Sequence, residues 1–165
     1  MFNITNNVSA ILSITTLINS FTIYVSWQRR KSNGGLYILL AMWTIAFWTV
    51  SAGLDYAAIP IALKVFFAKL EYIGFLYIPV AWISFCTRYT GWVKEKRNAL
   101  SIPALIVSTV LFILVATNDL HGLVWQEIRF IQSGSFSVLR PVYGPLFWVI
   151  ALYVWGTLFA GALLV

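Results

Sequence analysis

The stretch KVFFAKLEYIGFLYIPVAWISFCTRYTG, Lys64–Gly91, decides the fold predicted for this chain. After Glu71 it contains no charged side chain before Arg88, and a helix that spans a membrane needs about 20 mostly apolar residues. A helix over Ile61–Arg88 would be about 42 Å long at about 1.5 Å per residue, longer than the roughly 30 Å hydrocarbon core. We therefore expect a transmembrane helix whose first, lysine-bearing turns lie at one membrane interface.

The composition of the whole chain supports the same class. Its 165 residues are 61% hydrophobic and 10% charged, whereas a soluble domain carries roughly 25% charged residues. Helices are expected because a spanning segment must satisfy its own backbone hydrogen bonds. The predicted fold class is an all-α integral membrane protein. Its bundle of five transmembrane helices is expected at about residues 8–28, 36–55, 61–89, 99–117 and 142–164.

Lysine and arginine predict the orientation of this bundle. Seven of the eleven basic residues lie in two short connections, WQRRKSNGG after the first apolar run and RYTGWVKEKRN after the third. Such residues are enriched on the cytoplasmic side of membrane proteins. The protein is thus expected in the plasma membrane, with its N-terminus outside and its C-terminus in the cytoplasm. Membrane lipids are expected partners, whereas nucleic acid is not, because the basic residues form no continuous face.

The longest connection, residues 118–141, faces outward in this orientation. Its first residues, Asn118 and Asp119, are expected to end the fourth helix or to start a turn, since short polar side chains bond nearby backbone groups. Farther on, β-forming residues flank QSGS on both sides. This pattern predicts a short β-hairpin over about Gln126–Arg140, within the outer loop 118–141.

Within these 165 residues we find no catalytic set. His121 is the only histidine and Cys86 the only cysteine, so neither can contribute to a histidine or cysteine metal cluster. A glycine-rich phosphate loop and a nucleophile elbow are also missing. We therefore expect no catalytic residue, no metal and no cofactor in this chain, and the sequence leaves open whether the complete protein is an enzyme.

Polar residues of the outer half form the candidate sensing site. Charged groups at membrane depth are expected to face the bundle interior or water, so we expect Asp55, Lys69, Glu71 and His121 to converge on a small polar pocket. Glu71 should lie within reach of loop residues such as His121 or Trp125. The alternative is structural, with lysines that reach the interface, a hydrogen-bonded Glu71 and a loop histidine without a ligand.

The third helix also contains a predicted hinge. Pro79 lacks a backbone donor and crowds the carbonyl of Phe75, which favours a kink between Gly74 and Pro79. Because many kinks are simply packing features, a hinge is one of two interpretations.

The run Leu70–Gly91, followed by SIPALIV and TNDLHGLVW, resembles the N-terminal seven-helix membrane region of bacterial sensor histidine kinases. The shared order is Glu-Tyr-Ile-Gly, a proline, Trp-x-x-Phe, Tyr-Thr-Gly, an Ile-Pro that opens the next helix, and Thr-Asn-x-x-His-x-x-x-Trp. The matching positions are Glu71, Tyr72, Gly74, Pro79, Trp82, Phe85, Tyr89, Gly91, Pro103, Asn118, His121 and Trp125. Tyr72, Trp82, Asn118 and Trp125 complete the candidate ligand-binding or sensing residues.

The resemblance implies a single transmembrane sensor domain over residues 1–165. Such a domain would pass an extracellular or membrane stimulus to a cytoplasmic kinase region of the same full-length chain, a protein histidine kinase of a two-component system. A small ligand of unknown identity and a second copy in a homodimer are further expected partners. Since the family has seven helices, these residues are expected to be a truncated piece. A fragment of a small transporter or channel, or a structural membrane subunit, is the alternative.

Overall fold

The computed structural model of the chain describes residues 4–91, 99–133 and 136–165. These ranges form a mostly helical structure with one two-stranded antiparallel sheet. In chain order the elements are α1 (Ile4–Gln28), α2 (Gly35–Ala57), α3 (Ile61–Tyr89), α4 (Ser101–Ala116), α5 (Asn118–His121), β1 (Trp125–Ser133), β2 (Phe136–Tyr143) and α6 (Pro145–Leu164). The predicted helical bundle with a hairpin is therefore confirmed.

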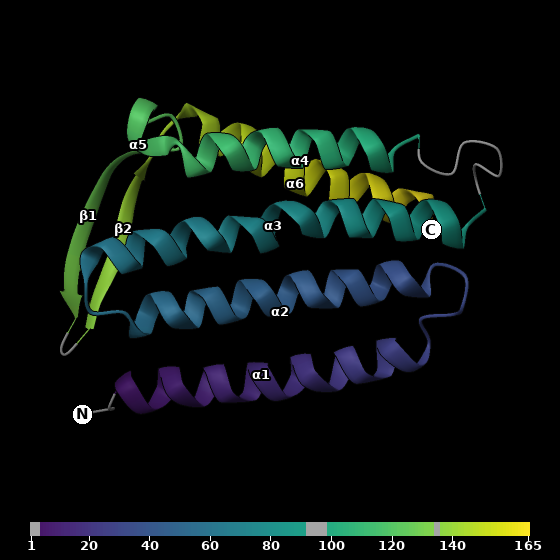
Figure 1. The fold of residues 1–165 in the computed structure, drawn as a ribbon, viewed down its shortest axis with the longest axis horizontal. Helices are drawn as coiled ribbons and strands as arrows, with labels where there is room; N and C mark the ends of the chain where they lie inside the picture. Colours follow the sequence, from purple (N-terminus) through teal and green to yellow (C-terminus); the bar gives the residue numbers. More distant parts are fainter. Residues whose placement is uncertain (1–3, 92–98, 134–135) are drawn as a thin grey trace.

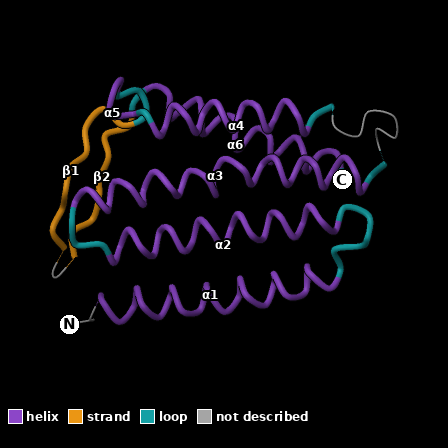
Figure 2. Tube along the Cα trace, in the orientation of Figure 1, coloured by secondary structure: helices purple, strands orange, loops and turns teal. Residues whose placement is uncertain are grey.

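Helix α3 occupies the middle of the bundle (Figure 1). α1, α2 and α3 lie side by side in this order, and α4 and α6 pack against the remaining side of α3. The hairpin β1–β2 crosses one end of the bundle, the end near which the chain begins, whereas the chain ends at the opposite end (Figure 2). Every long helix thus runs from one end of the bundle to the other.

Length and composition identify two candidate membrane spans among the described helices, α2 and α6. Helix α4 is apolar but has only 16 residues. It is shorter than the predicted 99–117, and α6 begins at Pro145 rather than at residue 142 because β2 continues to Tyr143. A proline in the first helical turn is favourable, since its missing N–H would have no partner there. That all five long helices cross a membrane stays a prediction.

A buried apolar cluster holds α3, α4 and α6 together. Its fully buried members include Leu76 from α3, Val115 from α4 and Ile150 from α6. Val124 and Trp125, at the start of the hairpin, belong to the same cluster. The hairpin is therefore continuous with the core of the bundle and is not a separate appendage.

The contact between α2 and α3 depends on Gly74. A Cβ atom at this position would lie 2.7 Å from the carbonyl oxygen of Thr44 and 2.9 Å from the Cα of Trp48. Only glycine allows the two backbones to approach this closely, as small residues do at helix contacts in membranes. Pro79 is buried farther along α3, which continues through it to Tyr89. The hinge role of Gly74 and Pro79 stays a prediction, and the structure adds a packing role for Gly74.

The hairpin pairs Trp125 with Tyr143 at its base and Ser133 with Phe136 at its far end, with an irregularity between Trp125 and Glu127. It therefore covers and slightly extends the predicted range. At the base, Gly144 donates its backbone N–H to the Val124 carbonyl at 2.8 Å. The end of β2 is thus fastened where α6 begins.

Candidate functional site

Asn118 organises the segment between α4 and the hairpin. Its Oδ1 accepts the backbone N–H groups of Val124 at 2.9 Å and Trp125 at 3.1 Å, and its Nδ2 donates to the Trp125 carbonyl at 3.0 Å. The side chain is buried, and a buried amide is stable only when its polar atoms have partners. Helix α4 ends at Ala116, and Asn118 and Asp119 follow it as the first residues of the four-residue helix α5. Asn118 fixes the backbone that presents Trp125.

His121 forms hydrogen bonds with residues that are close to it in the sequence. Its Nδ1 accepts the backbone N–H of Leu123 at 3.0 Å, while Nε2 lies 3.0 Å from the Leu114 carbonyl oxygen and 3.4 Å from the Thr117 hydroxyl. An Nδ1 that accepts a hydrogen bond assigns the proton to Nε2, which then donates to Leu114. His121 therefore closes the turn after α4, and these bonds do not direct it toward Glu71.

Lys69 also lies apart from Glu71. Its ammonium group is 2.7 Å from the Asp119 carboxylate and 3.1 Å from the Ala116 carbonyl oxygen. Residues two apart on a helix point about 200° apart around its axis, so Lys69 and Glu71 leave α3 in different directions. Lys69 thus fastens α3 to the end of α4 and to α5.

A pocket of about 190 Å³ opens between α2, α3 and the hairpin. Its charged lining consists of Asp55 from α2 and Glu71 from α3. The remaining lining residues are aromatic or apolar: Ala68, Tyr72, Trp125, Ile128, Leu139, Pro141 and Tyr143. The structure therefore brings together four of the predicted site residues, Asp55, Glu71, Tyr72 and Trp125.

The two carboxylates of the pocket differ in their partners. Asp55 and Glu71 are close enough to repel each other electrostatically, and the Trp48 side chain is a hydrogen-bond partner of Glu71. Trp48 and Asp55 are seven residues apart, which places both on one face of α2. In contrast, Asp55 Oδ1 is buried and has no hydrogen-bond partner among the described residues.

Lys64 supplies the positive charge nearest to Asp55. It is buried, with 2% of its surface exposed, and its Nζ donates to the Asp55 backbone carbonyl at 2.7 Å. Its charge also interacts with the Asp55 carboxylate. Lys64 therefore caps the C-terminal end of α2, where a cation is favourable. Its ammonium group is thus directed into the protein, and its position at the membrane interface stays a prediction.

Aromatic side chains from α3 and the hairpin line the pocket. The Trp125 indole N–H donates to the Tyr72 hydroxyl at 3.3 Å, and the two rings meet edge to face with centroids 5.6 Å apart.

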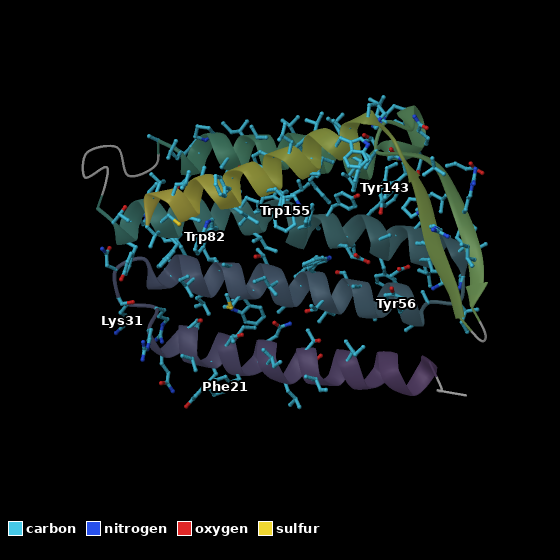
Figure 3. The ribbon with its side chains drawn as sticks, turned by 180° about the vertical axis from the view of Figure 1, so that it is seen from behind. Phe21, Lys31, Tyr56, Trp82, Tyr143 and Trp155 are labelled. Atoms are coloured by element: carbon cyan, nitrogen blue, oxygen red, sulfur yellow. The ribbon has the colours of Figure 1, made fainter. Side chains whose placement is uncertain are left out.

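Tyr143 lies at the hairpin end of the bundle, whereas Trp82 lies toward the other end (Figure 3). The Trp82 indole donates to the Leu158 carbonyl at 3.0 Å. Trp82 therefore connects α3 to α6 and takes no part in the pocket.

Several lining residues were absent from the sequence-based site. Leu139, Pro141 and Tyr143 alternate along β2, and alternate residues of a strand face the same side. This alternation in VLRPVY is a signal that could have assigned them to one face. Nothing in the sequence indicated that the Trp48 side chain would be a hydrogen-bond partner of Glu71.

Comparison with models of protein families identifies one family. The family described as the N-terminal 7TM region of histidine kinase matches residues 11–165. No curated protein and no solved structure matches the chain. The match covers α2 to α6, the hairpin and most of α1, and so includes every residue of the pocket. The chain belongs to the family of N-terminal 7TM regions of histidine kinases.

Proposed function

We propose that this chain is the membrane-embedded input region of a sensor histidine kinase and that the pocket beneath the hairpin receives the stimulus. The family match carries this proposal, and the pocket supplies a place for a signal to act. The kinase itself would follow in the full-length protein, together with two further helices. The stimulus would act by favouring one of two pre-existing arrangements of the helices.

The charge distribution supports an orientation with the hairpin outside. The hairpin end contains Lys64, Lys69, Arg129 and Arg140 and also the four acidic residues Asp55, Glu71, Asp119 and Glu127, so its charges cancel. At the other end the described basic residues are Arg29, Arg30, Lys31 and Arg88. In the sequence, the connection from α3 to α4 adds Lys94, Lys96 and Arg97 against Glu95, which makes seven positive charges minus one negative. Of these, residues 94–97 lie outside the described part of the chain. Counted along the sequence, the net charge of +6 thus belongs to the α1–α2 and α3–α4 connections and the adjacent Arg88, and the positive-inside rule assigns such connections to the cytoplasm.

The outer surface of the helices supports a bundle surrounded by lipid. Large apolar side chains are exposed on helices at opposite sides of the bundle, including Leu17 on α1 and Leu152 on α6 at 71% and 76% exposure. Extensive apolar exposure is unfavourable in water and normal in hydrocarbon. We therefore assign all five long helices to the membrane, including α1, α3 and α4.

A direct structural path leads from the pocket to α6. The pocket residue Tyr143 ends β2, and its ring stacks on Phe147 in the first turn of α6 with centroids 3.8 Å apart. Gly144 between them is fixed to Val124. A ligand that moved β2 would therefore move the beginning of α6, whose other end points to the cytoplasmic side in the proposed orientation.

Polar contacts inside the bundle connect this movement to α3 and α4. The buried Ser108 hydroxyl of α4 donates to the Leu76 carbonyl at 2.6 Å and lies 2.9 Å from the Tyr153 hydroxyl of α6. The single hydrogen of the Tyr153 hydroxyl can be donated either to Ser108 Oγ or to the Ala104 carbonyl, which lies 2.8 Å away. These bonds join the three helices, and Leu76 is three residues before Pro79, so a shift of α6 would be transmitted to α3.

The test uses the full-length gene product in membrane vesicles. We expect transfer of phosphate from ATP to a histidine of the protein. Trp125→Ala should change the initial rate of this transfer by about threefold or more, because it removes an aromatic side chain that lines the pocket. Trp155→Ala is the matched control, because Trp155 is exposed on α6 away from the pocket. A gene that stops after Val165 without a neighbouring kinase gene, or equal rates for all three proteins, would overturn the proposal.

A further inference from the structure

We propose that the pocket beneath the hairpin binds the ammonium group of a small alkylammonium compound. This inference names the ligand class of the input pocket and so rests on the proposed function. It is carried by two features that occur together, a net negative charge and aromatic walls. Neither feature alone would identify a ligand.

The charges fit one monovalent cation. Asp55 and Glu71 line the pocket with two carboxyl groups, and no lysine or arginine among the described residues lines it. Lys64 offsets one of these charges from beside Asp55. The described lysines and arginines within ion-pair distance of a carboxylate are Lys69 and Arg129, which are paired with Asp119 and Glu127. When both carboxyl groups are ionised, one negative charge is left for a ligand.

A buried carboxylate oxygen without a partner adds to the negative potential of the pocket. Asp55 Oδ1 is fully buried without a hydrogen-bond partner among the described residues, and an unsatisfied buried carboxylate oxygen is costly. Asp55 lies in the last turn of α2, where the helix dipole adds further negative potential. A cation bound in the pocket would offset this negative potential electrostatically, which needs no hydrogen-bond donor.

The walls favour an organic cation over a metal ion. Tyr72, Trp125 and Tyr143 line the pocket, and aromatic faces attract ammonium groups through their quadrupoles. Ile128 and Leu139 offer apolar contacts for methyl or methylene groups. A hard metal ion prefers about six oxygen ligands, and the described residues contain no group of three or more potential metal ligands.

Choline provides the probe, and its neutral isostere 3,3-dimethylbutan-1-ol provides the control. Both are titrated calorimetrically into the purified chain in dodecyl maltoside micelles at constant ionic strength. We expect saturable binding of one choline per chain and no measurable binding of the isostere. Equal binding of both compounds, or binding of neither, would overturn the inference on the unaltered protein.

Variants then locate the bound choline. Asp55→Asn and Glu71→Gln keep the side-chain shape and remove the charge, so each should weaken choline binding by about tenfold or more. Asp119→Asn is the matched control at the same end of the bundle, and its affinity should equal that of the parent. Only variants that elute from size exclusion like the parent are compared. Unchanged affinity in both pocket variants would also overturn the inference.

The same ammonium chemistry occurs in free amines and in lipid headgroups. Repeating the choline titration in phosphatidylcholine nanodiscs separates these sources. A lower affinity than in micelles identifies competition by the headgroup, and an equal affinity identifies a free compound, so either outcome supports an ammonium site. Choline that binds without changing phosphorylation by the full-length protein would contradict the proposed function and leave this inference intact.

Discussion

The Trp125 indole donates a hydrogen bond to the Tyr72 hydroxyl at 3.3 Å, and this bond joins the first residue of β1 to the middle helix of the bundle. The Asn118 side chain fixes the backbone of Trp125, because it forms hydrogen bonds with the Trp125 N–H and carbonyl groups. Tyr72 in turn packs against Phe75, with ring centroids 6.2 Å apart. The hairpin is therefore fixed to α3 at the pocket, and a change there reaches both elements.

Our first prediction concerns the orientation. In a Cys86→Ser background, a cysteine at Gln126 should react with a membrane-impermeant maleimide added to intact cells, whereas cysteines at Ser32 or Asn98 should react only after lysis. Gln126 and Ser32 are exposed at opposite ends of the bundle, and Asn98 lies outside the described residues. Labelling of the Ser32 or Asn98 variant in intact cells would contradict the proposed topology.

A second prediction follows from the three hydrogen bonds of Asn118. Asn118→Ala leaves two backbone N–H groups and one carbonyl unpaired in a buried place, so the free energy of unfolding should fall by about 2–4 kcal/mol. Hydrogen exchange should become faster in β1 before it does so in α2. Asn33→Ala is the control, because its exposed amide makes a single bond to the Arg88 carbonyl. A loss below about 0.5 kcal/mol for Asn118→Ala would show that the hairpin does not depend on it.

A third prediction compares two helical glycines. Gly74→Ala should reduce the free energy of unfolding by about 1–3 kcal/mol, because the new methyl group would force α2 and α3 apart. Gly156→Ala should be neutral or stabilising by up to about 1 kcal/mol, since alanine favours a helix and no atom lies within 4 Å of its Cβ position. Unfolding by denaturant in micelles measures both. Equal effects at the two positions would contradict the close approach at Gly74.

A fourth prediction tests the contact between α4 and α6. Ser108→Ala and Tyr153→Phe each remove one hydroxyl group of the pair that lies 2.9 Å apart. In a double-mutant cycle we expect a coupling energy of about 0.5–1.5 kcal/mol, the range known for interhelical hydrogen bonds in membranes. The control pair is Thr157→Val with Tyr153→Phe, because Thr157 donates only to a backbone carbonyl. Additive effects of Ser108→Ala and Tyr153→Phe would mean that the hydroxyl groups act separately.

Sequence patterns were sufficient where short-range physics controls the outcome. The apolar runs predicted the helices because a long apolar segment has few stable alternatives. The β-forming residues around QSGS predicted the hairpin for a similar local reason. Even the divergence of Lys69 and Glu71 follows from a spacing of two residues on a helix. By itself, then, the sequence determined a helical bundle, its hairpin and the polar character of one end.

Only the tertiary structure decided which polar residues meet. Asp55 and Glu71 share a pocket because α2 and α3 approach closely at Gly74, whereas Lys69 and His121 bond the end of α4. Tyr143 reaches the same pocket through the register of the hairpin, which pairs it with Trp125. These partners are far apart along the chain, and the helical period fixes only the direction in which each side chain leaves its own helix. The neighbour it finds there depends on how the helices pack.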